Sequence, residues 1–190
     1  IATTNGLSII KPDTVITILN DSAIKKIYTD QNKNTWLVAD DGLYFMKENG
    51  QLQRLKSEYE TLPENIRSIA QTQSGIILLA SNSGLYSLDR DKTVSQVRSE
   101  FCHSVFVDKK GDIWASTEKG LFLCEYTNTQ QLSNWQRLNE KLNIPEISFH
   151  DFFETSNGGI YLISDYHLYL VLTLHQEAIL YDQNDGLLPN

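Results

Sequence analysis

The sequence contains few of the residues that stabilise small or specialised folds. Two cysteines in 190 residues are too few for a disulfide scaffold, and Cys102 and Cys124 show no C-x-x-C spacing. We expect two small buried side chains rather than zinc or thiol redox chemistry. A Lys/Arg-rich run and a stretch of about 18 apolar residues are also missing, which argues against broad nucleic-acid binding and against a membrane span.

Charge and composition narrow the class further. The chain has 24 acidic residues against 16 Lys and Arg, a formal net charge of −8, and 41% hydrophobic residues. An acidic chain does not suit a phosphate backbone. At this length folding buries roughly 70% of the unfolded surface, so a core needs neither disulfides nor a metal. The chain starts at Ile1 without a signal-peptide pattern, and we expect its natural start to lie upstream.

Four segments repeat one pattern of apolar and turn positions. In each, an apolar residue precedes a large apolar residue, and a turn residue, a leucine and an aromatic residue follow. The segments are Ile24–Tyr44, Ile66–Tyr86, Cys102–Phe122 and Phe149–Tyr169. The turn residues of the four segments are Gly42, Gly84, Gly120 and His167, and Gly6 holds the same position in an offset copy that opens the chain. Their spacing of roughly 36 to 47 residues is typical of β-propeller blades.

Each unit reads as four short strands separated by Gly, Asn, Asp and Ser. In the second full unit the strands are expected at Ile66–Gln71, Ile76–Ser81, Leu85–Asp89 and Val94–Arg98. Helical periodicity is weak throughout, and the best window, Leu132–Leu142, is interrupted by an expected outer strand at Trp135–Arg137.

The predicted fold is therefore all-β, with four-stranded antiparallel blades of a β-propeller. We expect about four and a half blades that form part of a larger propeller, because closure normally removes free strand edges. The expected units are a half blade at 1–20, blades at 23–60, 64–99, 101–139 and 146–183, and a link at 184–190. Exposed blade edges would favour self-association.

Several motifs resemble the two-component regulator propeller repeat. An Ile-x-x-Ile/Val-x-x-Asp pattern followed by Gly-Asp-Ile-Trp-Ala-Ser-Thr-Glu-Lys-Gly-Leu at Gly111–Leu121 is similar to its repeat unit. The stretches Leu62–Ile66 and Asn184–Asn190 resemble the link that leads into each new blade. Leu78, Tyr161 and His167 depart from the family's Trp and Gly positions.

The resemblance implies a periplasmic sensor domain of a bacterial membrane receptor. In such receptors a histidine kinase or diguanylate cyclase output domain lies beyond a transmembrane helix that this segment does not contain. The resemblance also implies a ligand bound at the channel mouth or between propellers, and glycan-derived ligands in some members. The segment itself would be non-catalytic and would act by favouring one receptor arrangement over another.

One column of the repeat alignment is basic in an otherwise acidic chain. The column lies two positions before the apolar residues Ile27, Ile69, Val105 and Phe152. It consists of Lys25, Arg67, His103 and His150. In a propeller these positions would lie at one mouth of the channel, where a cationic arc attracts anions. Alternatively, these side chains bridge neighbouring blades through hydrogen bonds to carbonyl groups or to acids such as Asp151.

The hairpins on the same rim add further candidates. Tyr166 and His167 are the first choice for ligand contacts, since they replace small turn residues with groups that stack and hydrogen-bond. Asp40 and Asp41 are expected to be solvated turn residues. We expect no metal and no cofactor, because the four histidines have no metal-ligand spacing.

Trp36 and Trp114 occupy the apolar slot of the repeat and should pack between blades.

Two other functions remain open at this point. A protein-interaction scaffold would lose its partner in Trp135→Ala, and a fragment of a propeller lyase or glycosidase would lose turnover in His103→Ala or His150→Ala. The leading partner is a small anionic or carbohydrate ligand.

Overall fold

The computed structural model describes residues 1–48, 50–55, 61–91, 93–126 and 132–186 of the chain. These residues form one three-stranded and four four-stranded sheets, and all strand pairs are antiparallel. Every sheet consists of strands that are consecutive in the sequence. The predicted all-β architecture of propeller blades is confirmed.

The first sheet consists of β1 (Ala2–Thr3), β2 (Gly6–Lys11) and β3 (Thr14–Asn20). The second consists of β4 (Ile24–Thr29), β5 (Thr35–Ala39), β6 (Gly42–Met46) and β7 (Leu52–Arg54). The third consists of β8 (Ile66–Gln71), β9 (Ile77–Ser81), β10 (Gly84–Leu88) and β11 (Val94–Arg98). The fourth consists of β12 (Cys102–Val107), β13 (Ile113–Thr117), β14 (Gly120–Cys124) and β15 (Trp135–Arg137). The fifth consists of β16 (Asp151–Glu154), β17 (Ile160–Ile163), β18 (Leu168–Leu172) and β19 (Glu177–Tyr181).

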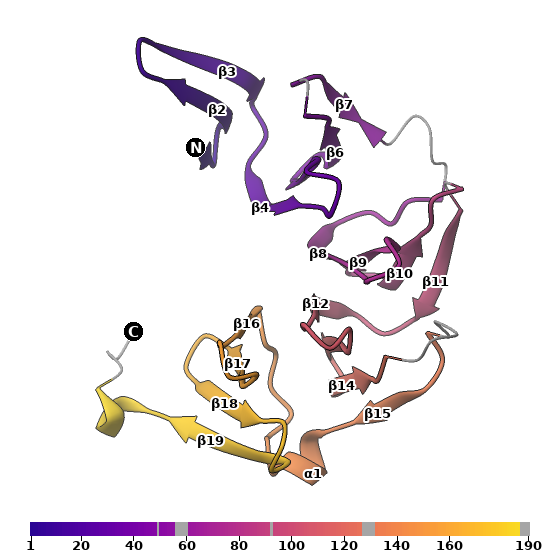
Figure 1. Cartoon of the computed structure of the whole chain (residues 1–190), viewed down its shortest axis with the longest axis vertical. Helices are drawn as coiled ribbons and strands as arrows, with labels where there is room; N and C mark the ends of the chain where they lie inside the picture. The colour runs from indigo at the N-terminus through magenta and orange to yellow at the C-terminus, as the bar shows by residue number, and fades with distance from the viewer. Residues whose placement is uncertain (49, 56–60, 92, 127–131, 187–190) are drawn as a thin grey trace.

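The sheets follow one another around an arc (Figure 1). The first strands of the four larger sheets, β4, β8, β12 and β16, lie on the inside, and β7, β11, β15 and β19 lie outside. The first sheet, expected as a half blade, has three strands. In the first sheet Gly6 lies opposite Thr3, and in the third sheet Gly84 lies opposite Ser81 in the same way. The strands of the first sheet therefore correspond to the second, third and fourth strands of the other sheets.

The glycine at this turn is required by the geometry. Gly84 has φ +136°, and a Cβ atom there would lie 2.1 Å from the carbonyl oxygen of Arg98. A side chain at this position would therefore clash with the backbone of the neighbouring strand.

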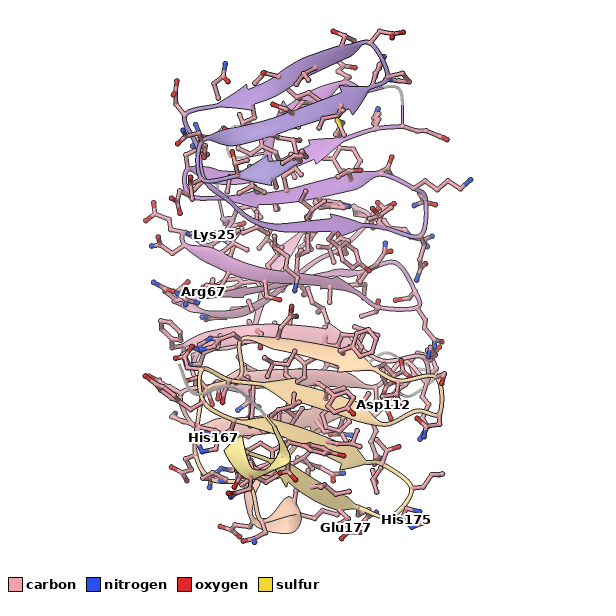
Figure 2. The ribbon with its side chains drawn as sticks, turned by 90° about the vertical axis from the view of Figure 1, so that its left-hand side faces the viewer. Lys25, Arg67, Asp112, His167, His175 and Glu177 are labelled. Atoms are coloured by element: carbon pink, nitrogen blue, oxygen red, sulfur yellow. The ribbon has the colours of Figure 1, made fainter. Side chains whose placement is uncertain are left out.

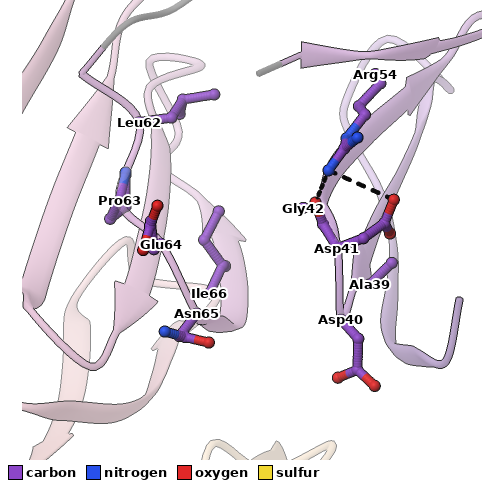
Figure 3. A pocket seen from close by; sticks show the side chains of 10 residues that line it. All are labelled: Ala39, Asp40, Asp41, Gly42, Arg54, Leu62, Pro63, Glu64, Asn65 and Ile66. Carbon is purple, nitrogen blue, oxygen red and sulfur yellow. Dashed lines mark hydrogen bonds and ion pairs between the residues drawn. The ribbon is translucent and has the colours of Figure 1, made fainter.

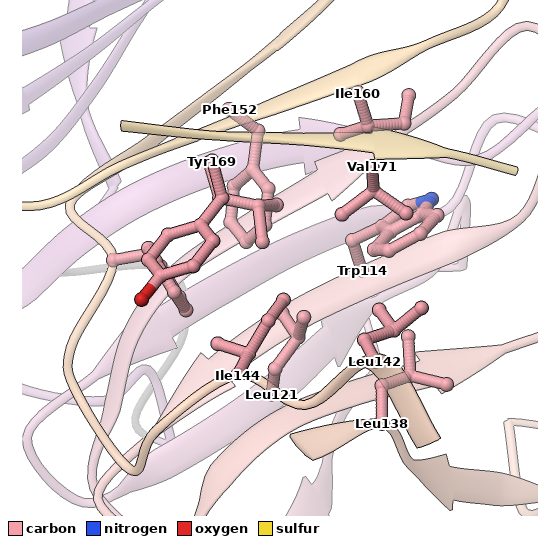
Figure 4. Packing of buried hydrophobic residues seen from close by; sticks show 11 residues of the cluster. Trp114, Leu121, Leu138, Leu142, Ile144, Phe152, Ile160, Tyr169 and Val171 are labelled. Atoms are coloured by element: carbon pink, nitrogen blue, oxygen red, sulfur yellow. The ribbon is translucent and has the colours of Figure 1, made fainter. Parts of the chain in front are cut away.

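The core consists of layers between the sheets. Trp36 and Trp114 are 8% and 2% exposed, which confirms their predicted packing role, and both cysteines are buried and free. Figure 4 shows the layer between the fourth and fifth sheets. It contains Trp114, Leu121, Leu138, Leu142, Ile144, Phe152, Ile160, Tyr169 and Val171. Burial of each large apolar side chain contributes about 1.5–3 kcal/mol.

Serine hydroxyls connect the inner strands of neighbouring sheets. The Ser68 hydroxyl donates to the carbonyl oxygen of Val105 over 3.3 Å. The Ser104 hydroxyl donates to the carbonyl oxygen of Phe149 over 2.5 Å, and the Phe149 N–H donates to Ser116 Oγ over 2.8 Å. These serines are buried. The hydroxyls therefore satisfy main-chain groups where two sheets meet.

The link between the fourth and fifth sheets contains one helical turn that the sequence pattern did not predict. Helix α1 (Asn139–Leu142) ends at Asn143, which adopts a left-handed conformation with φ 50°. The Asn139 side chain accepts a hydrogen bond from the Leu121 N–H over 2.8 Å and donates to the Ile144 and Pro145 carbonyls. Side-chain bonds of this kind are set by tertiary position and leave no periodic pattern.

Neither α1 nor the 3₁₀ turn η2 (Gln183–Asp185) could cross a membrane, and the described residues contain no other helix long and apolar enough to do so. The link expected at 184–190 lies outside the described residues from position 187 onward.

A buried aspartate holds the core tryptophan in two of the sheets. In the fourth sheet, Asp108 Oδ2 accepts the indole N–H of Trp114 over 3.1 Å, and Oδ1 accepts two backbone N–H groups of its own turn. Asp30 and Trp36 form the same arrangement over 3.0 Å. Burial raises the pKa of Asp108, whereas hydrogen bonds from Trp36 and Asn34 outweigh burial at Asp30 and lower its pKa.

We predict that Asp108→Ala lowers the free energy of unfolding by about 1–3 kcal/mol, because the Trp114 indole N–H and two turn N–H groups lose their acceptor. Chemical denaturation followed by tryptophan fluorescence measures the change. Asp13→Ala, in an exposed turn, is the matched control and should unfold like the unaltered chain. Equal midpoints for the two variants would contradict the prediction.

Candidate functional site

Three of the four basic residues of the predicted column occupy β-bulges. In β4, Ile24 pairs with Ala39 and Lys26 with Val38, so Lys25 is the extra residue. Register shifts at the same place in β8 and β12 make Arg67 and His103 the extra residues. A bulge redirects a side chain out of the regular alternation. His150 directly precedes β16, and its N–H donates to the Ile163 carbonyl over 2.8 Å.

These residues lie at one rim of the molecule. Figure 2 shows Lys25, Arg67 and His167 at one edge, and Asp112, His175 and Glu177 at the opposite edge. The second-to-third-strand hairpins lie at the same rim as the bulges, because the second strand runs back from the first.

Three members of the column contact the hairpin of their own sheet. Lys25 Nζ lies 2.8 Å from an Asp40 carboxylate oxygen, and His150 Nε2 lies 3.0 Å from Asp165 Oδ1. Arg67 Nη1 lies 3.5 Å from the side-chain oxygen of Asn82. Asp151, the example given for bridging between blades, pairs with Lys26 over 2.7 Å, whereas His103 contacts Ser148 in the link to the fifth sheet.

Three of the six candidate residues lie together in one cluster. Arg67, His103 and His150 come from the third, fourth and fifth sheets. The Arg67 guanidinium lies over the Phe101 ring at 5.3 Å, and the Phe101 and His103 ring centroids are 4.6 Å apart. The His103 and His150 ring centroids are 6.3 Å apart. We call Arg67, Phe101, His103 and His150 the rim cluster.

His103 is the most constrained member of the rim cluster. Its Nε2 lies 2.8 Å from Ser148 Oγ, and its Nδ1 is buried without a hydrogen-bond partner among the described residues. Burial lowers the pKa of His103, and the charges of Arg67 and His150 lower it further. Glu118 opposes this shift. The neutral ring is therefore the favoured form at neutral pH.

The other candidates lie outside the rim cluster. Lys25 pairs with Asp40. Tyr166 points into solvent with 76% of its surface exposed. His167 stacks on Tyr169 at 6.2 Å, and its N–H donates to Ser164 Oγ. No sequence pattern indicated Phe101 or Ser148, which enter the site only through tertiary contacts.

A pocket of about 350 Å³ opens at the same rim between the second and third sheets (Figure 3). Asp40, Asp41 and Arg54 line one side, and residues 62–66 line the other. The link motif of the sequence therefore forms a pocket wall. The pocket combines carboxylates with a single guanidinium.

Asp41 is an exposed turn residue, as expected, but its carboxylate is also held by several contacts. Its carboxylate accepts hydrogen bonds from the hydroxyls of Ser22 and Tyr44, the latter over 2.5 Å, and pairs with Arg54 at 3.5 Å. Burial opposes ionisation, but these contacts outweigh it and lower the pKa of Asp41. Burial and the nearby Asp41 raise the pKa of Tyr44 to about 12. Asp41 thus connects several segments beside the pocket.

Within the described residues, no group of three or more His, Cys, Asp or Glu side chains is arranged to hold a metal ion. The chemistry that the rim offers is the positive charge and the N–H donors of Arg67, with the imidazole rings of His103 and His150 beside it.

Comparisons with known proteins agree with this architecture. Protein-family models and curated proteins gave no sequence match. Among solved structures, the extracellular domain described as that of hybrid two component system BT3049 from B. thetaiotaomicron is similar, with 17% identity and a TM-score of 0.83. The alignment covers 97% of this chain and 27% of that chain.

Two other solved structures share the fold. The extracellular domain of BT4673 from B. thetaiotaomicron is 17% identical, with a TM-score of 0.69 and coverage of 89% and 25%. Virginiamycin B lyase from Staphylococcus aureus is 11% identical, with a TM-score of 0.71 and coverage of 94% and 63%. This chain thus spans about a quarter of the length of the two extracellular domains. The similarities confirm, at the level of the fold, the resemblance to two-component regulator propellers.

We predict that Arg67→Gln raises the pKa of His103 toward the ordinary histidine value of 6.5, because it removes a positive charge that disfavours the imidazolium. A pH titration of the imidazole NMR signals measures the shift. Lys25→Gln is the matched control and should leave the pKa of His103 unchanged, since Lys25 pairs with Asp40. An unchanged pKa in Arg67→Gln would show that the two groups do not interact.

Proposed function

We propose that this chain is a ligand-sensing segment of an extracytoplasmic β-propeller in a bacterial membrane signalling receptor. Support comes from the fold similarity to extracellular domains of two-component systems. In this proposal the segment is periplasmic and non-catalytic, and a histidine kinase or diguanylate cyclase elsewhere in the receptor gives the output. The rim cluster is the proposed ligand site.

The ligand proposal rests on the neutral partner of Arg67. Lys25 and His150 each face a carboxylate in the hairpin of their own sheet, but Arg67 faces the neutral side chain of Asn82. Arg67 is exposed, and among the described residues it has no carboxylate within ion-pair distance. Its positive charge therefore remains available to a ligand.

The chemistry favours a small anion. A guanidinium presents parallel N–H donors that match a carboxylate, sulfate or phosphate group. The imidazole rings of His103 and His150 lie beside it and complete the polar lining of the site. A ligand that contacts side chains from three sheets would favour one relative arrangement of those sheets, which is the differential binding that a sensor requires.

We predict that Arg67→Ala weakens binding of inorganic sulfate by about tenfold or more, with little change in the thermal midpoint. Sulfate is the probe because its charge is constant near neutral pH. NMR titration at fixed ionic strength measures affinity, and circular dichroism measures the midpoint. Lys25→Ala is the control and should change affinity by less than about twofold, since its charge is already paired.

An unchanged affinity together with a large fall in the midpoint of Arg67→Ala would assign Arg67 a structural role. That result would remove the rim cluster as the ligand site. It would leave the fold-based sensor proposal to be tested by other ligands.

A second candidate function is a propeller lyase. The similarity in fold to virginiamycin B lyase and the contact between His103 Nε2 and Ser148 Oγ favour it. Turnover of a streptogramin B substrate by this chain, abolished in a folded His103→Ala variant, would establish catalysis and displace the sensor proposal.

A further inference from the structure

We infer that the rim cluster binds its anion together with a proton, and that His103 carries this proton. The inference rests on the anion site proposed above. It adds that the site responds to pH as well as to ligand concentration. Protonation and anion binding would each strengthen the other.

The groups that face His103 come from four parts of the fold. Arg67 approaches from β8, with its guanidinium over the Phe101 ring that contacts His103. His150 approaches from the start of the fifth sheet, where Asp165 pairs with it. Glu118 acts from the hairpin between β13 and β14. Ser148, which is uncharged, contacts the ring nitrogen Nε2.

The balance of these charges disfavours a proton in the empty site. Arg67 lies on one side of His103 and a second imidazole on the other, while the ring itself is half-buried. Burial and these two neighbours act in the same direction and lower the pKa of His103. An arriving anion would supply the negative charge that an imidazolium at this position lacks.

The hydrogen-bonding state of the ring leads to the same conclusion. A neutral ring can satisfy Nε2 through Ser148 and leave only the lone pair of Nδ1 without a partner. A protonated ring carries an N–H at Nδ1, for which the described residues supply no acceptor. Because Nδ1 is buried, an anion at the rim would reduce the cost of protonation through its negative charge rather than through direct contact with Nδ1.

The expected result is that sulfate binds about fivefold or more tightly at pH 6 than at pH 8. The pKa of His103 should also rise when sulfate saturates the site. Both quantities come from NMR titrations of the His103 imidazole signals in the unaltered chain, with chloride used to hold the ionic strength constant. This measurement requires no variant to fold.

Variants then assign the proton to a residue. His103→Gln should abolish the pH dependence of sulfate binding. His175→Gln is the matched control, because His175 is exposed at the opposite edge of the molecule, and it should keep the full dependence (Figure 2). His150→Gln should also keep a dependence, since His103 remains present.

The outcomes separate this inference from the proposed function. Equal sulfate affinity at pH 6 and pH 8, with binding still sensitive to Arg67→Ala, would overturn the proton coupling and leave the anion site in place. A pH dependence lost in His150→Gln and kept in His103→Gln would overturn the assignment to His103. Absence of sulfate binding at both pH values would overturn the anion site and the coupling together.

Discussion

The close approach of the inner strands is the constraint on which the rest of the structure depends. Buried serine hydroxyls on β8 and β12 bond to the main chain of the next sheet, so β8, β12 and the start of the fifth sheet are held within hydrogen-bond reach. Apolar layers between the sheets provide most of the stabilisation. The hydroxyls set the position of each inner strand relative to the next sheet, because a buried carbonyl or N–H without a partner is costly. The starts of these strands consequently meet at one rim.

At that rim, a basic side chain faces a hairpin residue of its own sheet in the second, third and fifth sheets, with different chemistry in each. In the second and third sheets a bulge redirects a basic side chain, and a hairpin residue of the same sheet faces it. His150, which directly precedes β16, faces its hairpin in the same way. Lys25 and His150 face carboxylates, whereas Arg67 faces an amide. A paired and exposed charge contributes little to stability or to recognition. The substitution of an amide for a carboxylate in one sheet is therefore enough to leave a cation available for a ligand.

The repeat pattern in the sequence predicted the strands well, because alternation and turn residues report local backbone preferences. The strands of the third sheet were expected within about one residue of their observed bounds. The basic column was also visible in the sequence. The bulges, the place of Phe101 beside His103, and the contacts of Asp41 were not, because they depend on contacts between segments distant in sequence. Helix α1 was missed because it has no periodic sequence pattern. Side-chain hydrogen bonds of Asn139 define its place instead.

The column immediately after the bulge shows how position and residue type together decide a role. Ser68 and Ser104 occupy it in the third and fourth sheets and bond to the next sheet. Lys26 and Asp151 occupy it in the second and fifth sheets and pair with each other over 2.7 Å. Both side chains are partly exposed, so the pair contributes about 0–1 kcal/mol and does not hold the sheets in place. Its formation is instead a consequence of the arc: the packing of the intervening sheets curves the inner strands until the second and fifth sheets come within reach of one lysine side chain.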